Sequence, residues 1–313
     1  MRILHCFSRD RSRGLTTTNS NSTVGSVQFS IIIPVYNDWN SLSGCLRSLA
    51  KQEDSPKFEV IVVDDGSREP APDSILEWNN RYPLSIVRQP NAGIAAARNR
   101  GIQESRGEIV VFTDADCRFQ TNCLSLLGGT INSFPQHSRF QLHIVGDCSN
   151  TVGRAEELRL IAIQNQTQLG DGRIRYLNTS GFAIRKSSLS SDFVLFDPAA
   201  RRAEDTLLLA NLVKHGELPL FADDCIVQHS ISLSLWACLL KDVRKGRIEG
   251  RTSELIQRTG VRVTMQNRGR LRMLISTWKL ARNRSIGRAA WAVLVARQFV
   301  ERTVTTVSRY LPV

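Results

Sequence analysis

The chain has 313 residues and a mass of 35.1 kDa, with 42% hydrophobic and 22% charged residues. This is the composition of a globular protein, and it excludes a disordered, collagen-like or coiled-coil description of the whole chain. The seven cysteines are scattered and include no Cys-x-x-Cys pair. They therefore favour neither a disulfide framework nor a zinc site, and they indicate a reducing compartment.

The positive charge is concentrated in the C-terminal quarter of the chain. Residues 241–313 hold 17 of the 41 Lys and Arg but only four of the 29 Asp and Glu, so this segment carries +13 and the rest −1. Such a tail predicts contact with an anionic partner, either phospholipid headgroups or nucleic acid. No stretch reaches the roughly 18 to 20 apolar residues that a membrane-spanning helix needs. The N-terminus also lacks the apolar stretch of a signal peptide; its Arg- and Ser-rich composition favours a disordered extension over an organellar transit peptide.

The first half of the chain alternates between strand and helix patterns. Residues 1–26 are expected to form a flexible extension, because residues 8–26 offer almost nothing to bury. Apolar runs at 29–38, 58–67 and 107–116 predict buried parallel strands, and 84–89 predicts a further strand. Helical patterns lie between them at 42–49, 75–80 and 94–104. This alternation predicts an α/β fold of the nucleotide-binding type, with a mostly parallel central sheet flanked by helices.

The second half is harder to divide into elements. Residues 120–200 read as less regular, with a polar loop at 165–172 and strands at 143–148 and 181–184. A helix is expected at 204–215, ending at Gly216, and a strand at 225–230. We expect a catalytic domain over 27–240 and a basic helical tail over 241–313. Two amphipathic patterns in the tail place apolar residues on one helix face: Leu271, Leu274, Ile275 and Trp278, then Trp291, Leu294, Val295 and Phe299.

Acidic residues follow two of the predicted strands. Asp64 and Asp65 come after VIVV, and Asp114 and Asp116 come after IVVFT. Because the carboxyl ends of parallel strands meet at one edge of a sheet, these carboxylates are expected to share a site. They could hold a hard divalent cation that bridges a diphosphate, or each could simply cap the following helix.

Three further groups are candidates for the same site. Arg98 lies in the helical stretch NAGIAAARNRG, whose small residues allow close approach to the sheet. Glu204 and Asp205 open the helix at 204–215, where acids are favourable dipole partners or, for Asp205, a general base. His229 ends the strand at 225–230 and could be either a metal ligand or a structural group.

The succession SIIIPVYND, VIVVDDGS, NAGIAAARNRG, EIVVFTDAD, TSGFAIRKS, AEDTLLLANLVKHG and IVQHS resembles the motif series of the family-2 glycosyltransferases with the GT-A fold, over roughly residues 28–250. The resemblance implies an inverting transferase that uses a nucleotide-diphosphate sugar and a divalent cation, Mn²⁺ or Mg²⁺. It implies a transferase of cell-surface polysaccharide or glycolipid synthesis, acting on a glycan or lipid-linked acceptor.

The resemblance also implies a role for each matching residue. Tyr36 would stack on the nucleobase beside Pro34, Asp65 would hydrogen-bond the base, and Arg98 would lie near base and phosphate. Asp114 would contact the ribose. Asp116 and His229 would bind the metal ion. Asp205 would deprotonate the acceptor hydroxyl, and Glu204 would help to place the acceptor or the donor sugar. Arg244 or Arg247 could reach the diphosphate.

Two other classes of protein remain as alternatives. A nucleotidyltransferase would need a Gly-rich phosphate loop near the first strand, where the chain has PVYNDWN. A catalytically inactive binder of sugar nucleotides or nucleic acid would use the basic tail, but no nucleic-acid module is recognisable and nucleic acid is not the expected partner. We expect a cytoplasmic enzyme that lies at the inner face of an anionic membrane.

Overall fold

A computed structural model describes residues 28–190, 192, 194–200, 203–230, 234–261, 267–283 and 287–308. In the helices, the side chains of residues 244–254, 267–272, 283, 305 and 308 are not described. The expected N-terminal extension, the Leu271 side chain and the side chains of Arg244 and Arg247 thus lie outside the described part.

The first half of the sheet follows the predicted alternation. Strands β3 (Leu84–Arg88), β2 (Phe58–Asp64), β1 (Phe29–Val35) and β4 (Ile109–Phe112) are adjacent in this order and parallel. The intervening helices are α1 (Trp39–Leu49), α2 (Asp73–Leu76) and α3 (Ile94–Glu104), with a 3-10 turn at Glu77–Asn80. Ile31 and Ile33 face the core that contains α1, whereas Ile32 faces the opposite core with α3. Burial on both faces explains why these strands are continuously apolar.

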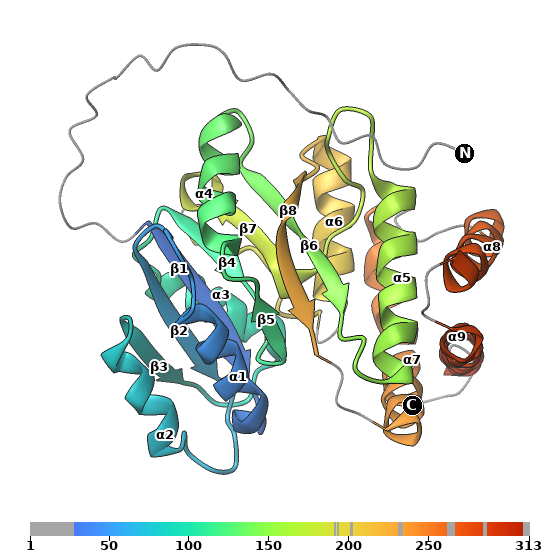
Figure 1. Ribbon diagram of the computed structural model, residues 1–313, viewed down its shortest axis with the longest axis horizontal. Coiled ribbons are helices and arrows are strands. Elements are labelled where there is room, and N and C mark those ends of the chain that lie inside the picture. The colour runs from blue at the N-terminus through green and yellow to red at the C-terminus, as the bar shows by residue number, and fades with distance from the viewer. Residues whose placement is uncertain are drawn as a thin grey trace.

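The second half of the sheet mixes strand directions. The order continues as β7 (Phe182–Arg185), β6 (Arg139–Gly146), β8 (Leu220–His229) and β5 (Cys117–Phe119). Strand β7 is antiparallel to β4 and β6, β6 is parallel to β8, and β8 is antiparallel to β5. Four of the seven pairings between described strands are therefore parallel. The predicted α/β class with helices on both faces is confirmed (Figure 1).

The prediction of a less regular segment over residues 120–200 is wrong in two places. Helix α4 (Cys123–Ser133) packs on β8, and helix α5 (Thr151–Thr167) covers residues 165–167 of the expected polar loop. The sequence of helix α5 lacks a clear amphipathic pattern because the helix is buried on more than one side. It contacts β6 on one side and two C-terminal helices on the other, and buried polar residues interrupt its apolar face. The strands predicted at 143–148 and 181–184 correspond to β6 and β7.

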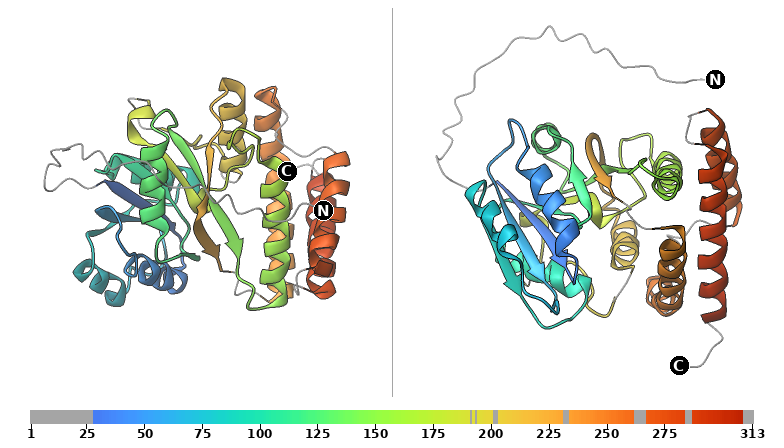
Figure 2. Two further views of the ribbon diagram at one scale, coloured as in Figure 1. Left: turned by 45° about the horizontal axis from the view of Figure 1, so that its top comes forward. Right: turned by 60° about the horizontal axis from the view of Figure 1, so that its bottom comes forward.

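The C-terminal part is helical, as predicted. Helix α6 (Glu204–His215) ends at Gly216, whose φ of 72° is the left-handed conformation of a helix C-cap. It is followed, after β8, by α7 (Leu235–Arg258), α8 (Asn267–Asn283) and α9 (Arg288–Ser308). Helix α7 is continuous across residue 241, where the tail was expected to begin. Helices α8 and α9 lie side by side along α5, on the side away from the sheet (Figure 2).

The two amphipathic faces of the tail are only partly covered. Leu294 is 1% exposed and packs with Ala155 and Leu158 of α5, and the rings of Trp278 and Trp291 are in contact. Ile275 and Phe299, from the same two patterns, are 49% and 70% exposed. Within the described residues, no helix combines the length and apolar character needed to cross a bilayer.

Candidate active site

The carboxyl ends of the strands bring together most of the predicted site residues. Pro34 is half-buried in β1, and the Tyr36 ring just beyond this strand is 53% exposed. Asp65 follows β2, and Asp114 and Asp116 lie just after β4. The end of β8 pairs with β5, so that His229 lies opposite Cys117 and next to Asp116. The fold thus places His229 beside Asp116, while Asp65 lies at the carboxyl end of the parallel strand β2.

Asp64 and Asp65 both make hydrogen bonds within the protein. The Asp64 carboxylate accepts from the Ser67 backbone N–H at 2.8 Å, which is the local turn expected of a buried strand-end acid. The Asp65 carboxylate accepts from Gln89 Nε2 and from the backbone N–H groups of Ala92 and Gly93, at 2.8 to 2.9 Å. Asp65 thus ties the end of β2 to the start of α3. Since a carboxylate has about four acceptor positions, about one further position remains after these three bonds.

Arg98 is the centre of a buried ionic network. Its side chain is 1% exposed, Nη1 donates to Glu204 Oε1 at 2.5 Å, and Nη2 donates to Asp114 Oδ1 at 2.8 Å. The guanidinium also lies 5.6 Å from the centre of the Phe196 ring. Burial alone would lower the pKa of Arg98, but the two carboxylates raise it above its ordinary value. In this structure Arg98 therefore organises the acids around it.

The close approach of α3 to the sheet makes this network possible. Ala95 and Ala97 are buried against the sheet, and a Cβ on Gly101 would come 2.3 Å from Ile32 Cγ2. A larger residue at these positions would hold the helix away, and Arg98 would not reach both partners. The sequence indicated the small residues, but it could not show that Arg98 would face Glu204, which is 106 residues away.

Asp116 and His229, the two residues predicted as metal ligands, are in contact with each other. His229 Nε2 lies 3.2 Å from Asp116 Oδ2, and the two side chains are 20% and 29% exposed. Burial alone would raise the pKa of Asp116, but the His229 hydrogen bond holds it below its usual value. Burial alone would lower the pKa of His229, but the same hydrogen bond raises it. The lowered pKa favours the ionised carboxylate of Asp116, and the raised pKa favours the protonated imidazole of His229, so the two favoured forms attract each other.

This pair fits a divalent cation. The described residues contain no cluster of three or more His, Cys, Asp or Glu side chains arranged to hold a metal ion. One carboxylate and one imidazole suit Mn²⁺, whose remaining ligands can be diphosphate oxygens and water. A metal between the two side chains would replace their mutual hydrogen bond.

Asp205 lies in the first turn of α6, beside the Arg98 network. Its Oδ1 accepts from the Thr206 backbone N–H at 2.6 Å and from Thr206 Oγ1 at 3.2 Å, and the residue is half-buried. The preceding Ala203 has a φ of 57°, a left-handed conformation that a side chain rarely adopts. This strained turn sets the direction in which α6 starts. The charge of Asp205 acts on Arg98, so both belong to one electrostatic environment.

Two residues that were not named from the sequence also act on the site. Ser180 Oγ donates to Asp114 Oδ2 at 2.7 Å, so that Asp114 is held between Ser180 and Arg98. Glu156 of α5 lies within electrostatic range of His229. The sequence offered a signal for Ser180, which belongs to the quoted TSGFAIRKS motif. Glu156 carried none, because it lies in the helix that was missed.

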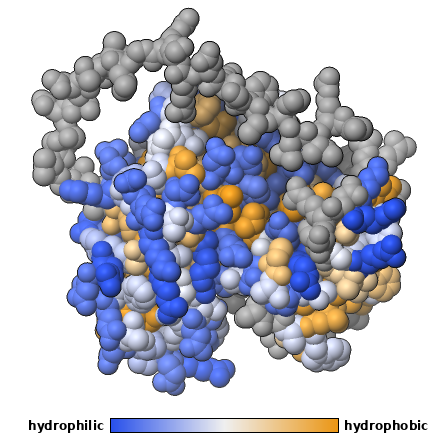
Figure 3. All heavy atoms as spheres, viewed as in Figure 1, coloured by the Kyte–Doolittle hydropathy of each residue, from blue (hydrophilic) through white to orange (hydrophobic). Residues whose placement is uncertain are grey.

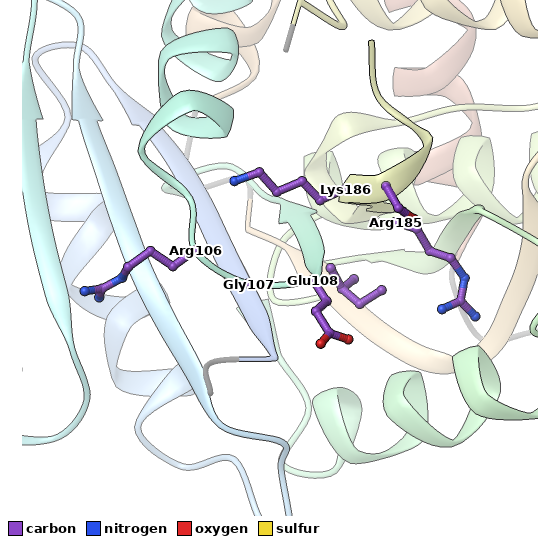
Figure 4. Close-up of a pocket in the computed structure, with 7 residues that line it drawn as sticks. Arg106, Gly107, Glu108, Arg185 and Lys186 are labelled. Carbon is purple, nitrogen blue, oxygen red and sulfur yellow. The ribbon is translucent and has the colours of Figure 1, made fainter. Parts of the chain in front are cut away.

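A hollow of about 350 Å³ lies at the other end of the sheet and belongs to the structural framework. Among its lining residues, Arg106 donates to Glu59, Lys186 to the Ser105 carbonyl, and Arg185 to the carbonyls of His137 and Ile131. Arg106, in the loop before β4, and Arg185, at the end of β7, extend in opposite directions (Figure 4). The basic side chains around this hollow thus bond to neighbouring parts of the framework.

The sequence of this chain is similar to those of known glycosyltransferases. The profile of the family described as Glycosyl transferase family 2 matches residues 30–190, just over half of the chain. The minor teichoic acid biosynthesis protein GgaA of Bacillus subtilis is 37% identical over 102 residues, which cover 31% of this chain and 23% of GgaA. The alignments span between 22% and 30% of the length of three other curated glycosyltransferases.

Solved structures share the fold over most of the chain. The mannosyltransferase PcManGT from Pyrobaculum calidifontis, in complex with GDP-Man and Mn²⁺, has a TM-score of 0.56 at 18% identity, covering 92% of this chain and 85% of that one. Staphylococcus aureus TarS 1-349, in complex with UDP-GlcNAc, has a TM-score of 0.54 at 16% identity and covers 91% of both chains. The predicted GT-A fold is confirmed, and the match over residues 30–190 shows that the chain belongs to glycosyl transferase family 2.

Proposed function

We propose that this protein transfers a sugar from a nucleotide-diphosphate donor to an acceptor hydroxyl, with inversion at the sugar carbon. The observation that carries the proposal is the pairing of Asp116 with His229 at the same end of the sheet as Asp205. The family match favours a glycosyltransferase over a nucleotidyltransferase or an inactive binding protein.

The donor would lie across the carboxyl ends of the first four strands. The exposed Tyr36 ring, next to Pro34, offers a flat apolar surface for a nucleobase, and Asp65 keeps one acceptor position for a base N–H. Asp114 is 28% exposed and held by two donors, so it could accept a hydrogen bond from a ribose hydroxyl. Arg98 would act through Asp114 and Glu204, because its guanidinium is buried between them.

Asp116 and His229 would hold the divalent cation. When bound, the cation would neutralise charge that develops on the leaving diphosphate. The two side chains supply an oxygen and a nitrogen ligand at a partly exposed position, which leaves room for diphosphate oxygens. Mn²⁺ and Mg²⁺ are both compatible with this set, and the Mn²⁺ complex of a fold neighbour favours testing Mn²⁺ first.

Asp205 would act as the general base for the acceptor hydroxyl. A base on the face of the sugar opposite the leaving diphosphate gives an in-line displacement, and an in-line displacement inverts the configuration. The Glu204 carboxyl group accepts a hydrogen bond from Arg98, so it would shape the donor or acceptor position from a fixed place. Its contact to Arg98 would also keep the first turn of α6 in place.

We further propose that the acceptor belongs to cell-surface polysaccharide or glycolipid synthesis and that the enzyme works at an anionic membrane. Support comes from relatives named for minor teichoic acid biosynthesis and for poly(ribitol-phosphate) glycosylation. The basic C-terminal quarter and the exposed apolar residues of α8 and α9 support the membrane contact.

A donor screen combined with one substitution tests the transferase proposal. Thermal unfolding would be followed with UDP-GlcNAc, UDP-glucose and GDP-mannose, each with and without Mn²⁺. A true donor binds the folded state and should raise the melting temperature, more so with Mn²⁺. Asp205→Asn should keep this shift but release nucleoside diphosphate from that donor at least about 100-fold more slowly.

Asp223→Asn is the matched control, because Asp223 pairs with His143 at the middle of β8, away from the first turn of α6. Donor turnover by Asp205→Asn at the wild-type rate would exclude Asp205 as the base. A melting-temperature shift that is the same in excess chelator would exclude the metal-dependent mechanism.

A further inference from the structure

Arg297 connects helix α9 to helices α5 and α7. Arg297 Nε and Nη2 donate to the two carboxylate oxygens of Asp242 on α7, at 2.8 and 3.0 Å. Nη1 lies 3.4 Å from Glu156 Oε2 on α5. One guanidinium thus joins three helices, which we call the Arg297 clamp (Arg297, Asp242 and Glu156).

The carboxylates of the clamp are buried, so the fold would lose stability if they had no partner. Asp242 is 2% exposed and Glu156 is 5% exposed. A buried carboxylate that loses its partner is costly, whereas the intact pair fixes a geometry. Glu156 has a second partner in Arg159, but without Arg297 the Asp242 carboxylate would lose both of these hydrogen bonds.

Helices α5 and α7, which the clamp joins to α9, each follow one of the two strands that pair at His229. Helix α5 follows β6, and α7 follows β8. The two strands are parallel, Gly146 lies opposite His229, and the Asp147 N–H donates to the His229 carbonyl at 3.1 Å. On the other side, the Ser230 N–H donates to the Asp116 carbonyl at 2.9 Å. The end of β8 is therefore held between Asp116 and the loop that joins β6 to α5.

Charges of the clamp helices also act on the site. Glu156 lies within electrostatic range of His229, and Lys241, the neighbour of Asp242, lies within range of Asp116. A shift of α5 or α7 would therefore change the electric field at His229 and at Asp116.

We propose that Arg297 is a positioning residue for the metal and diphosphate site, and that α9 is therefore part of the catalytic unit. Arg297 would act through α5 and α7, which keep the end of β8 against Asp116. This inference rests on the proposed function, in which Asp116 and His229 bind the metal ion.

The test compares two clamp variants with a destabilising control. Arg297→Gln and Asp242→Asn each break the α7 arm of the clamp, from opposite partners. Leu294→Ala, one helical turn before Arg297 on α9, removes buried packing against α5 without touching the clamp. All variants would be measured at a temperature where each is fully folded, so that a clamp variant that fails to fold leaves the other to decide.

The first measurement is Mn²⁺ binding in the presence of saturating UDP and, separately, GDP. Binding is detected as a loss of the electron paramagnetic resonance signal of free Mn²⁺. We expect both clamp variants to weaken binding by about ten-fold or more, as changes around metal ligands commonly do, and Leu294→Ala to match the wild type. The second is hydrogen exchange at the Asp147 and Ser230 amides, which should become faster in the clamp variants only.

Three results would overturn the inference. Wild-type Mn²⁺ affinity in the folded clamp variants would show that Arg297 is merely structural. An equal loss in Leu294→Ala would assign the effect to general destabilisation. If the wild type bound no Mn²⁺ with either nucleotide, the metal site itself would be contradicted. That result is distinguishable from the first two, because in those the wild type does bind Mn²⁺.

Discussion

At the residue scale, Glu59 shows how the framework uses a buried charge away from the site. Its carboxylate accepts from Ser30 Oγ at 2.7 Å and from the backbone N–H and Nε of Arg106 at 2.7 and 2.8 Å. These bonds join β1 and β2 to the loop before β4. Glu59→Gln should lower the free energy of unfolding at pH 7 by about 1.5 to 3 kcal/mol, the usual range for hydrogen bonds to a charged group.

The same residue gives a pH dependence with a definite sign. Burial alone would raise the pKa of Glu59, but the bonds from Arg106 and Ser30 hold it below its ordinary value. A lowered carboxyl pKa stabilises the fold above the unfolded-state pKa, and this contribution is lost as pH falls through the folded-state pKa. The difference between wild type and Glu59→Gln, measured by urea unfolding, should therefore shrink from pH 7 to pH 3. A difference that stays constant would contradict the assignment.

Single residues of the site could be named from the sequence, but their pairings could not. Asp114, Asp116, Glu204 and His229 each stand at the end of a predicted element, where ligand-binding residues of α/β folds gather. The Arg98 contact with Glu204 joins two such elements across 106 residues, and no local pattern encodes it. For this reason Arg98 was expected near the ligand, whereas the structure places it between the acids.

At the element scale, the start of α5 approaches the loop after β6 more closely than a side chain allows. A Cβ on Gly153 would lie 1.6 Å from the Asp147 carbonyl oxygen. That carbonyl has little freedom, because the Asp147 N–H is bonded to the His229 carbonyl. Gly153→Ala should destabilise the protein by about 1 to 3 kcal/mol, as expected for overpacking.

Gly129 is the matched control, since it also lies inside a helix, α4, but a Cβ there would meet nothing within 4 Å. Gly129→Ala should stabilise the protein by up to about 1 kcal/mol through helix propensity. Chemical unfolding of the two variants measures both effects. If Gly153→Ala were as stable as Gly129→Ala, α5 would not be held by this close approach.

Elements with a simple environment were predictable, and those with a mixed environment were not. Helices α3 and α6 match their predicted bounds of 94–104 and 204–215, because one side faces the sheet and turn residues mark an end. Helix α5 is covered by both β6 and the C-terminal helices, so buried Glu156 and Gln164 interrupt its apolar pattern. The short strand β5 is defined by its pairing with β8 rather than by its own three residues.

At the scale of the whole molecule, the C-terminal helices pack against the rest of the protein and also carry its positive charge. Helices α7, α8 and α9 pack on each other or on α5, and Arg297 of α9 pairs with Asp242 of α7. Residues 241–313 nevertheless hold the whole net positive charge of the chain. Apolar and strongly hydrophilic side chains lie side by side over α8 and α9, whereas the half with β1–β3 is mostly hydrophilic on the same face (Figure 3).

This arrangement predicts salt-sensitive binding to anionic membranes. Each basic residue near such a surface contributes about 1 kcal/mol, and exposed apolar side chains can enter the headgroup region. Flotation with vesicles should recover the full chain with anionic but not with neutral lipid, and high salt should weaken recovery by screening. Phe299→Ser and Ile275→Ser should each lower recovery, because these side chains are 70% and 49% exposed on α9 and α8. Leu76→Ser on α2, where Leu76 is 51% exposed, is the matched control and should float like the wild type. Equal recovery of all three variants with anionic vesicles would show that α8 and α9 do not form the membrane-binding surface.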